Sequence, residues 1–479
     1  MFQKVLVANR GEIAVQIIRS LHELDIQAVA VYSTADENSL FVRLADEAVC
    51  IGGPQTAESY LNTFNIVNAA ILTGCDAIHP GYGFLSENAE FARLCEESNL
   101  KFIGPSYQTI ELMGNKSRAR ETMISANVPV IPGSNGMVRD LENAMVVAEQ
   151  IGYPVMLKAA DGGGGKGIRR INSPDELKKA YQAAQREAQT SFGNADLYLE
   201  KIIENAKHIE MQVIADQYGH YVFLPERDCS LQRTNQKVIE ETPCAVISHT
   251  ERETLGEIVV RAAKAIKYYN TGTIEFLMDQ DHHFYFMEMN TRLQVEHTVT
   301  EEVTGIELIK EQIKIAEGQK LSFSQLDVNI LGHAIECRIN AEDPSNNFMP
   351  SAGKIDHLFL PVGTMGVRID SGITQGSLIP PFYDSMIAKM IVIDSGITQG
   401  SLIPPFYDSM IAKMIVKMPT RQEAIVKMRR VLKEFEIAGV KCNKTFLEAL
   451  LVDKGFEKAQ FSTKYIENNF LKEWLNNEK

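Results

Sequence analysis

The residues best suited to chemistry lie in one stretch, residues 288–297, which reads EMNTRLQVEH. Every second residue of this stretch is polar, and the residues between them are Met, Thr, Leu and Val. Because alternate side chains of an extended chain share a face, we expect the polar residues to line one wall. These residues are Glu288, Asn290, Arg292, Gln294 and Glu296.

The chain just before this stretch predicts a hairpin. Residues 272–277 and 284–287 read as strands, and a short polar turn separates them. Their pairing would bring Glu275 beside Glu288, and two carboxylates with the amide oxygen of Asn290 suit a hard cation such as Mg²⁺. A half-buried strand with a solvated polar face is the alternative. We favour a site, because burying such charged groups is costly unless they pair or bind something.

A glycine-rich loop is the second candidate. A predicted strand over 154–159 is followed by DGGGGKG at 161–167 and then by the extended residues 168–171. No helix follows, and glycine stands where a P-loop needs Ser or Thr, so neither nucleotide fingerprint fits. The bare amides, with Lys158 and Lys166, favour phosphate binding over the alternative of a flexible linker.

The elements that must position these residues begin with an α/β alternation. Residues 4–8 predict a strand, 13–24 an amphipathic helix and 27–32 a second strand. This βαβ unit implies a parallel sheet. The loop at 79–88, rich in glycine and aromatic residues, is either a ligand wall at a strand end or a plain connection.

Later segments extend this pattern. Lys116 stands near the start of a predicted helix over 115–126, where helix N-termini favour anions, although a lone lysine there is usually solvated. Amphipathic helices dominate from residue 420 onward. Further strands are predicted at 198–203, 208–213 and 332–340.

Composition limits the classes of function. A chain of 479 residues predicts two to four domains, and its 45% hydrophobic and 23% charged residues are typical of globular proteins. A net charge of −14 argues against a nucleic-acid-binding surface but not against a small anionic ligand. The seven cysteines show no metal-binding spacing and suggest free thiols in a reducing compartment. We find no signal peptide or membrane span and expect a cytoplasmic protein.

A perfect internal duplication is visible near the C-terminus. Residues 369–392 and 393–416 are identical, with a period of 24 residues. Two perfect copies differ from a solenoid, which needs three or more diverged repeats. The even period preserves inside–outside alternation, so we expect one copy's worth of chain to take the native place. Register exchange between the copies, giving heterogeneity or swapped dimers, is the alternative.

At this point the chain resembles the biotin carboxylase family of the ATP-grasp superfamily. The resemblance runs from ANRGEIA at 8–14 to IAGVK at 437–441, and it is carried by HPGYGFLSEN (79–88), the glycine loop, EMNTRLQVEH and ECRINAEDP (336–344). It implies an α/β and α+β multidomain fold. The implied parts are a Rossmann-like N-terminal domain (1–113), a helical linker (114–130), an ATP-grasp lid (131–203) and a C-terminal catalytic domain (204–479).

The resemblance also implies a reaction. Bicarbonate would attack the γ-phosphate of ATP held with Mg²⁺ or Mn²⁺, and carboxyphosphate would carry the carboxyl group to biotin. This is the first half-reaction of acetyl-CoA carboxylase in fatty acid synthesis. The carboxylase portion of a pyruvate or acyl-CoA carboxylase is the alternative, as is an ATP-binding assembly partner impaired by the duplication.

Site residues follow from the resemblance position by position. Glu296 would be the base, fixed by Arg292, Gln294 and the Val295 amide; Arg338 would stabilise the biotin enolate, Tyr82 would touch the biotin ring and Lys237 would reach the phosphates. Glu275, Glu288 and Asn290 would bind the metal. The residues expected to hold ATP are Lys116, Lys158, Gly163, Gly164, Gly165, Glu200, Lys201, Ile203, His208, Gln232 and Leu277.

The implied partners are a biotin carboxyl carrier protein, carboxyltransferase subunits and a second copy of the chain in a homodimer. No Met-Lys-Met biotin acceptor occurs in the sequence, so we expect biotin to arrive on another polypeptide. Departures from the family are Asn235 at a position where many relatives carry histidine, Asp161 beside the glycine loop, and the duplication. We expect the duplication to weaken the dimer.

Overall fold

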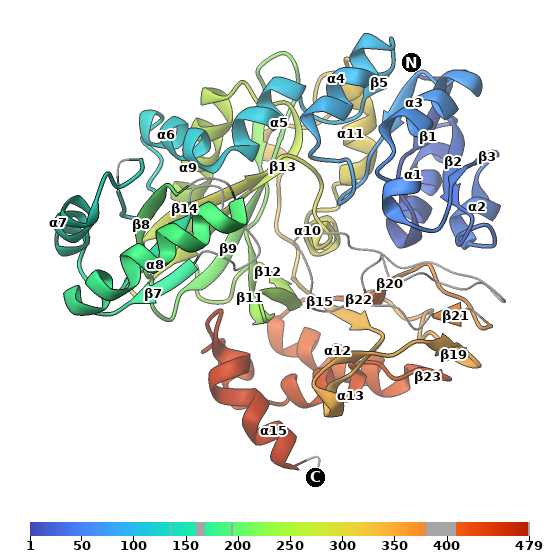
Figure 1. Cartoon of the computed structure of the whole chain (residues 1–479). Coiled ribbons are helices and arrows are strands. Elements are labelled where there is room, and N and C mark those ends of the chain that lie inside the picture. The colour runs from blue at the N-terminus through green and yellow to red at the C-terminus, as the bar shows by residue number, and fades with distance from the viewer. Residues whose placement is uncertain (135, 160–167, 193–194, 377, 380–408, 478–479) are drawn as a thin grey trace.

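The computed structural model describes residues 1–134, 136–159, 168–192, 195–376, 378–379 and 409–477 (Figure 1). The glycine loop, the junction between the two repeat copies and Asp161 lie outside these residues. Within the described ranges no helix is both long and apolar enough to cross a membrane. All seven cysteines are free.

The N-terminal region contains a parallel sheet of five strands in the order β3-β2-β1-β4-β5. Its strands are β1 (Lys4–Val7), β2 (Gln27–Ser33), β3 (Glu47–Gly52), β4 (Ala77–His79) and β5 (Lys101–Phe102). Helix α1 (Gly11–His22) joins β1 to β2 and buries its Ile13, Ile17 and Leu21 side chains. The predicted βαβ unit is therefore confirmed, with the helix beginning and ending two residues earlier than the pattern indicated.

The centre of the molecule is an antiparallel sheet of nine described strands, in the order β14-β13-β9-β11-β12-β15-β22-β20 with β10 beside β9. Neighbouring strands of this sheet carry the candidate site residues, so the sheet positions the site. Its strands are β9 (Lys207–Ala215), β10 (Tyr221–Phe223), β11 (Arg227–Arg233), β12 (Gln236–Thr242), β13 (Asn270–Met278), β14 (Phe284–Asn290), β15 (His333–Asn340), β20 (Val367–Ser371) and β22 (Met410–Met418).

A smaller sheet lies apart from the other two, at the left of Figure 1. It comprises β6 (Val155–Ala159), β7 (Ile168–Ile171) and β8 (Leu197–Lys201) in the order β7-β6-β8. Helices α7 and α8 pack on it, and the three strands and two helices share a separate apolar core. Strand β7 confirms that no helix follows the glycine loop.

The helices surround these sheets. Helix α9 packs on β9 and β10, α11 on β13, and α12 on β15 and β22 (Figure 1). The described α-helices are α1 (Gly11–His22), α2 (Leu40–Leu44), α3 (Thr63–Leu72), α4 (Ala89–Glu97), α5 (Tyr107–Gly114), α6 (Lys116–Ser125), α7 (Leu141–Ile151), α8 (Pro174–Phe192), α9 (His249–Ala265), α10 (His297–Thr304), α11 (Leu308–Ala316), α12 (Arg421–Glu434), α13 (Lys444–Leu450), α14 (Lys454–Glu457) and α15 (Leu471–Asn477). Short two-stranded pairs complete the C-terminal part: β16 (Glu342–Asp343) with β17 (Met349–Pro350), β18 (Gly353–Lys354) with β21 (Leu378–Ile379), and β19 (His357–Phe359) with β23 (Glu436–Ala438).

The repeat contributes to the central sheet from both of its copies. Strand β20 contains Ile369 to Ser371 of the first copy, and β22 contains Met410 to Val416 of the second. The two strands are antiparallel, with Ile369 opposite Met414. The described residues thus form one strand pair from the start of one copy and the end of the other.

Candidate active site

The predicted hairpin is present and has the expected register. Strands β13 and β14 pair antiparallel, and Glu275 stands opposite Glu288. The side-chain amide of Asn290 donates a hydrogen bond to Glu275 over 2.7 Å. Because directly opposed residues in such a ladder share a face, both carboxylates lie on the same side of the sheet.

The expectation that five alternating polar residues would line one extended wall is wrong beyond Asn290. Strand β14 ends there, because the backbone N–H of Thr291 donates to the Glu87 carboxylate (3.0 Å) instead of to a neighbouring strand. The Arg292 guanidinium also donates to Glu87 (2.8 Å). The following residues form a bend that leads into α10, so their side chains converge through the turn and not through strand alternation.

The bend still directs Gln294 and Glu296 back to the sheet. Gln294 donates to Glu275 over 2.7 Å and accepts from the Arg227 guanidinium over 2.8 Å. Glu296 is buried and forms ion pairs with Lys237 of β12 and Arg338 of β15, the latter at 3.0 Å. The structure therefore brings together the predicted base, the predicted biotin-side arginine and the lysine expected to reach phosphates.

Lys237 stands at the centre of a group of carboxylates. Its ammonium lies 2.6 Å from Glu210 and 3.5 Å from Glu275, in addition to its contact with Glu296. Burial alone would lower the pKa of Lys237, but the nearby negative charges outweigh that and raise it well above its ordinary value. The lysine is therefore a fixed positive charge.

Burial and the neighbouring charges have opposite effects on the pKa of Glu296. Burial would raise the pKa of its carboxyl group, but the positive charges of Lys237, Arg338 and Arg227 hold that pKa well below the usual range. Glu296 is thus ionised at neutral pH. By lowering this pKa, the cations restrain the basicity of the carboxylate.

The two opposed glutamates fit a hard cation. Burial and the negative charge of Glu275 raise the pKa of Glu288, whereas Lys237 and His208 outweigh burial and lower that of Glu275. A divalent cation between the two would relieve their repulsion, and carboxylate oxygens are its preferred ligands. The Asn290 oxygen instead accepts from Arg292 over 2.9 Å, so in this arrangement it is not directed at the two carboxylates.

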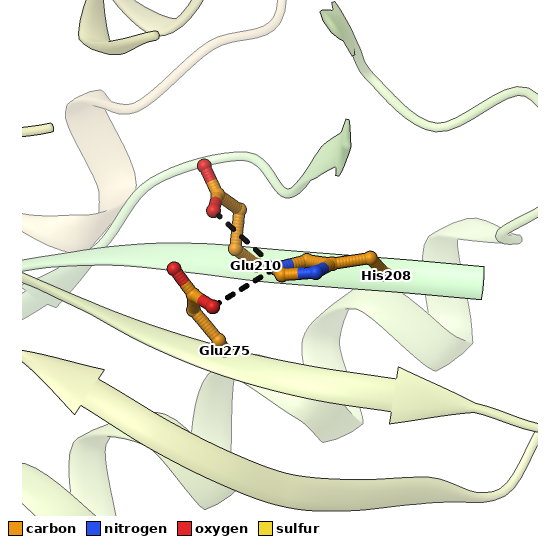
Figure 2. A group of neighbouring side chains, drawn as sticks. All are labelled: His208, Glu210 and Glu275. Atoms are coloured by element: carbon orange, nitrogen blue, oxygen red, sulfur yellow. Dashed lines mark ion pairs between the residues drawn. The ribbon is translucent and has the colours of Figure 1, made fainter. Parts of the chain in front are cut away.

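A histidine joins the metal-facing carboxylates. Figure 2 shows the His208 ring between Glu210 and Glu275, with its Nε2 atom 3.0 Å from Glu275 and 3.8 Å from Glu210. Its Nδ1 atom lies 3.0 Å from the Gln232 amide, so these two residues, both expected to hold ATP, are adjacent. These groups could hold a metal ion by their spacing, but Mg²⁺ prefers an all-oxygen set.

The residues expected to hold ATP come from several elements. Lys116 opens α6, and its charge acts on Glu288 of β14. Lys158 of β6 forms an ion pair with Glu200 of β8. The Lys201 ammonium donates to the carbonyls of residues 152 and 153 (2.8 and 3.1 Å), so it is held by backbone.

Leu277 and Ile203 complete the described part of that set. Leu277 stands opposite His208 in the ladder between β13 and β9, which places it at the same end of the sheet as the His208–Gln232 pair. Ile203 follows β8 and is half-buried. Gly163, Gly164 and Gly165 lie outside the described residues.

Tyr82 is fully buried in the loop that follows β4. Its hydroxyl donates to Glu12, and Asn9 holds the loop by donating to the carbonyls of Pro80 (2.8 Å) and Tyr82 (2.7 Å). Glu87 of the same loop binds Arg292, so the loop at 79–88 also contacts the bend after β14.

Sequence reasoning missed several residues of this site. Glu210 accepts from both Arg227 and Lys237, and Arg227 is completely buried. Glu240 binds Arg338 at 2.5 Å. A signal existed in the predicted strand at 208–213, where His208, Glu210 and Gln212 alternate with apolar residues just as the polar residues of 288–296 do.

Comparison with protein families accounts for almost the whole chain. Residues 1–110 match the family model described as biotin carboxylase, N-terminal domain, and residues 115–324 match carbamoyl-phosphate synthase L chain, ATP binding domain. The biotin carboxylase C-terminal domain matches in two pieces, 336–395 and 392–468. These pieces meet where the first repeat copy ends.

Similar proteins span the same length. Biotin carboxylase 1 of Bacillus subtilis is 52% identical, covering 98% of this chain and 98% of its own. One of the subunits of the pyruvate carboxylase of Methanothermobacter thermautotrophicus is 46% identical, covering 98% and 90%. The crystal structure of the biotin carboxylase domain dimer of Hydrogenobacter thermophilus 2-oxoglutarate carboxylase, in complex with MgADP, ADP and bicarbonate, superimposes with a TM-score of 0.86 at 47% identity, covering 98% and 97%.

Proposed function

The chain belongs to the biotin carboxylase family, and on that premise we propose how its own residues carry out the reaction. It is an ATP-grasp ligase that uses ATP and bicarbonate to carboxylate biotin. Both ATP and bicarbonate are anions, so positioning and charge neutralisation dominate the catalytic task.

The observation that carries the proposal is the buried group around Glu296. Lys237 and Arg338 contact this carboxylate directly, and the opposed carboxylates of Glu275 and Glu288 lie on the neighbouring hairpin. A carboxylate with two cationic partners and a pair of opposed carboxylates therefore meet in one place. That combination suits the transfer of a phosphoryl group to a small oxyanion.

Glu275 and Glu288 would hold Mg²⁺ or Mn²⁺, with Asn290 orienting Glu275 through its amide. When bound, the cation supplies charge neutralisation at the phosphates of ATP. Lys116 opens a helix beside Glu288, where it would contact the phosphates. Lys158 would do the same once it parts from Glu200.

Glu296 would take the proton of bicarbonate. Lys237 restrains the basicity of Glu296, so a shift of the lysine toward the phosphates of bound ATP would raise the pKa of Glu296 toward the operating pH. ATP binding and activation of bicarbonate would thereby be coupled through one ammonium group. Lys237 keeps Glu210 as a partner throughout, which limits the distance over which it must move.

The remaining residues would position the two carboxyl-transfer substrates. Arg292 and Gln294 are fixed by Glu87 and Glu275, and with the Val295 amide they would orient bicarbonate. Arg338 extends from β15 to Glu296 and would stabilise the negative charge that develops on biotin.

The test is ADP release by the whole chain with Mg-ATP and bicarbonate, with and without free biotin. We expect biotin to stimulate release, and Glu296→Gln to lower the stimulated rate about 100-fold or more, the usual effect of losing a general base. Glu241→Gln is the matched control, because Glu241 is also a buried carboxylate held by two side-chain partners, His333 (2.8 Å) and Arg421 (2.7 Å). Equal rates for both variants would contradict the assignment.

We further propose that the chain acts on biotin borne by a separate carrier protein, next to carboxyltransferase subunits, as a homodimer in the cytoplasm. The support is that similar chains are named subunits of carboxylases, that one forms a domain dimer, and that all seven cysteines are free. Acetyl-CoA is the proposed final acceptor; relatives named for pyruvate and 2-oxoglutarate provide the alternatives. The domain limits at residues 113, 130 and 203 stay predictions.

A further inference from the structure

One lysine of the duplicated segment is buried beside the proposed active site. Lys413 lies on β22 and is fully buried. Its ammonium is 3.0 Å from the Glu12 carboxylate, and it donates a hydrogen bond to the carbonyl of Val295 over 2.9 Å. It also lies 5.8 Å from the centroid of the Tyr82 ring. One side chain therefore connects the repeat, the first turn of α1, the loop after β4 and the bend after β14.

The bond to Val295 acts on the proposed base. The Val295 carbonyl belongs to the peptide unit that joins Val295 to Glu296, and a peptide unit is planar. Orienting this carbonyl therefore also orients the backbone from which the Glu296 side chain extends. Glu12, in turn, anchors the ammonium from the other side and accepts from the Tyr82 hydroxyl. Removing Lys413 would free both segments at once.

Resting on the proposed role of Glu296, we propose that Lys413 is a positioning residue for bicarbonate activation, and that the second copy of the repeat supplies it. The first copy contains an identical lysine, Lys389, with the same neighbours in sequence. Lys389 lies outside the described residues. The chain thus carries two chemically equivalent lysines for one buried position. Strand β22 contains the later of the two, Lys413.

The flanks of β22 favour the second copy. This strand continues past the repeat, so that Lys417 stands opposite Ala334 and Met418 opposite His333. The Lys417 N–H donates to the carbonyl of Gly366 over 2.9 Å. Strand β22 then leads through a short turn into α12, which packs against it.

A first-copy strand would lose these flanks. Ile393 and Asp394 would then follow the repeat strand at the places of Lys417 and Met418, and a carboxylate would stand where a half-buried methionine packs against the core. A full repeat of 24 residues would also separate the strand from α12. Burying an unpaired carboxylate is unfavourable, so the second copy is the better occupant.

Lys413→Met and Lys389→Met form the test pair, each made in the whole chain. Initial rates of biotin-stimulated ADP release give kcat and KM for bicarbonate and for ATP. We expect Lys413→Met to lower kcat/KM for bicarbonate about 100-fold, the usual effect of displacing a reacting group by about 1 Å, with the KM for ATP unchanged. Lys389→Met should match the wild type. Equal values for the two variants, or a defect in Lys389→Met alone, would overturn the proposal.

A second variant separates positioning from folding. Lys413→Met leaves the buried Glu12 without its ammonium, which destabilises the fold. The double variant Glu12→Gln/Lys413→Met removes both charges, so its thermal midpoint should return toward that of the wild type. The bicarbonate defect should persist, because the bond to Val295 is still absent.

Recovery of normal bicarbonate kinetics in the double variant would overturn the positioning role, since Lys413 would then serve only to neutralise Glu12. If the proposed function itself were wrong, the result would be distinct from these, because the wild-type chain would show no ADP release stimulated by biotin.

Discussion

The buried carboxylate of Glu210 allows a test of how the charge group is stabilised, by which we mean Lys237, Arg227, Glu210, Glu275 and Glu296. This residue of β9 accepts from the Arg227 guanidinium and lies 2.6 Å from the Lys237 ammonium. Glu210→Gln keeps the size of the side chain, removes its charge and turns one of its two acceptor oxygens into an amide donor. The variant therefore tests what this carboxylate contributes to holding the two cations.

The magnitude follows from what each cation retains. Lys237 keeps Glu296 and Glu275 as partners, so its pairing survives the change. Arg227 is completely buried, and within the described part of the chain Glu210 is the only carboxylate with which it forms a direct ion pair. Its other partners are neutral amide and hydroxyl oxygens. A buried guanidinium left in this way costs about 3–5 kcal/mol.

The assay is urea unfolding in metal-free and nucleotide-free buffer, followed by the fluorescence of Trp474, the single tryptophan of the chain. This residue packs in the same apolar core as β12, β15 and β22 of the central sheet. We expect Glu210→Gln to lower the free energy of unfolding by about 3–5 kcal/mol.

Glu240→Gln is the control for this experiment. Arg338 retains Glu296 at 3.0 Å when Glu240 is neutralised. Burial, partly offset by the charge of Arg338, raises the pKa of Glu240 to about 7, so the group is already partly protonated at neutral pH. Its loss should cost about 1 kcal/mol or less. A decrease of less than about 1 kcal/mol in the free energy of unfolding for Glu210→Gln, or equal decreases for both variants, would refute the reasoning.

Three further outcomes are expected. Burial opposes ionisation of Glu241, but a hydrogen bond from His333 and a nearby guanidinium outweigh it and lower its pKa from 4.5 to about 2. The ionised form therefore contributes about 3 kcal/mol to the free energy of unfolding above pH 4.5, and this contribution is lost as pH falls toward 2. The difference in that free energy between the wild type and Glu241→Gln should be smaller at about pH 3 than at pH 7. A difference that does not change with pH would contradict this. Glu275→Gln and Glu288→Gln should each raise the half-saturating Mg²⁺ concentration about tenfold or more in the ADP assay; unchanged Mg²⁺ dependence would exclude these ligands. Deleting any 24 consecutive residues within 369–416 produces the same single-copy chain, and gel filtration should show more dimer for it than for the parent; equal masses would contradict a dimer weakened by the duplication.

Much of the fold could be predicted from local patterns. The βαβ unit at the N-terminus, the helix opened by Lys116 and the hairpin that opposes Glu275 and Glu288 all appear where the sequence indicated. Each depends on interactions between residues near one another in the chain, so side-chain periodicity is enough to reveal it.

The bend after Asn290 could not be predicted in the same way. Polar residues alternate through to Glu296, and alternation predicts a continuing strand. The strand ends because Glu87, from a loop 204 residues earlier in the chain, captures the backbone and side chain that follow. A contact over such a distance leaves no periodic trace in either segment.

The sequence by itself indicated the family, because Glu288, Glu296 and Arg338 stand in its motifs, and the resemblance then predicted roles for these residues and for Lys237 and Glu275. It also determined that two equivalent lysines compete for one place, because residues 369–392 and 393–416 are identical. Only the tertiary structure decided their arrangement: Glu210 and Arg227 complete the charge group, and Lys413 reaches Val295 from β22. The physical reason is that buried charges must find partners in space, and these partners come from strands far apart in the chain.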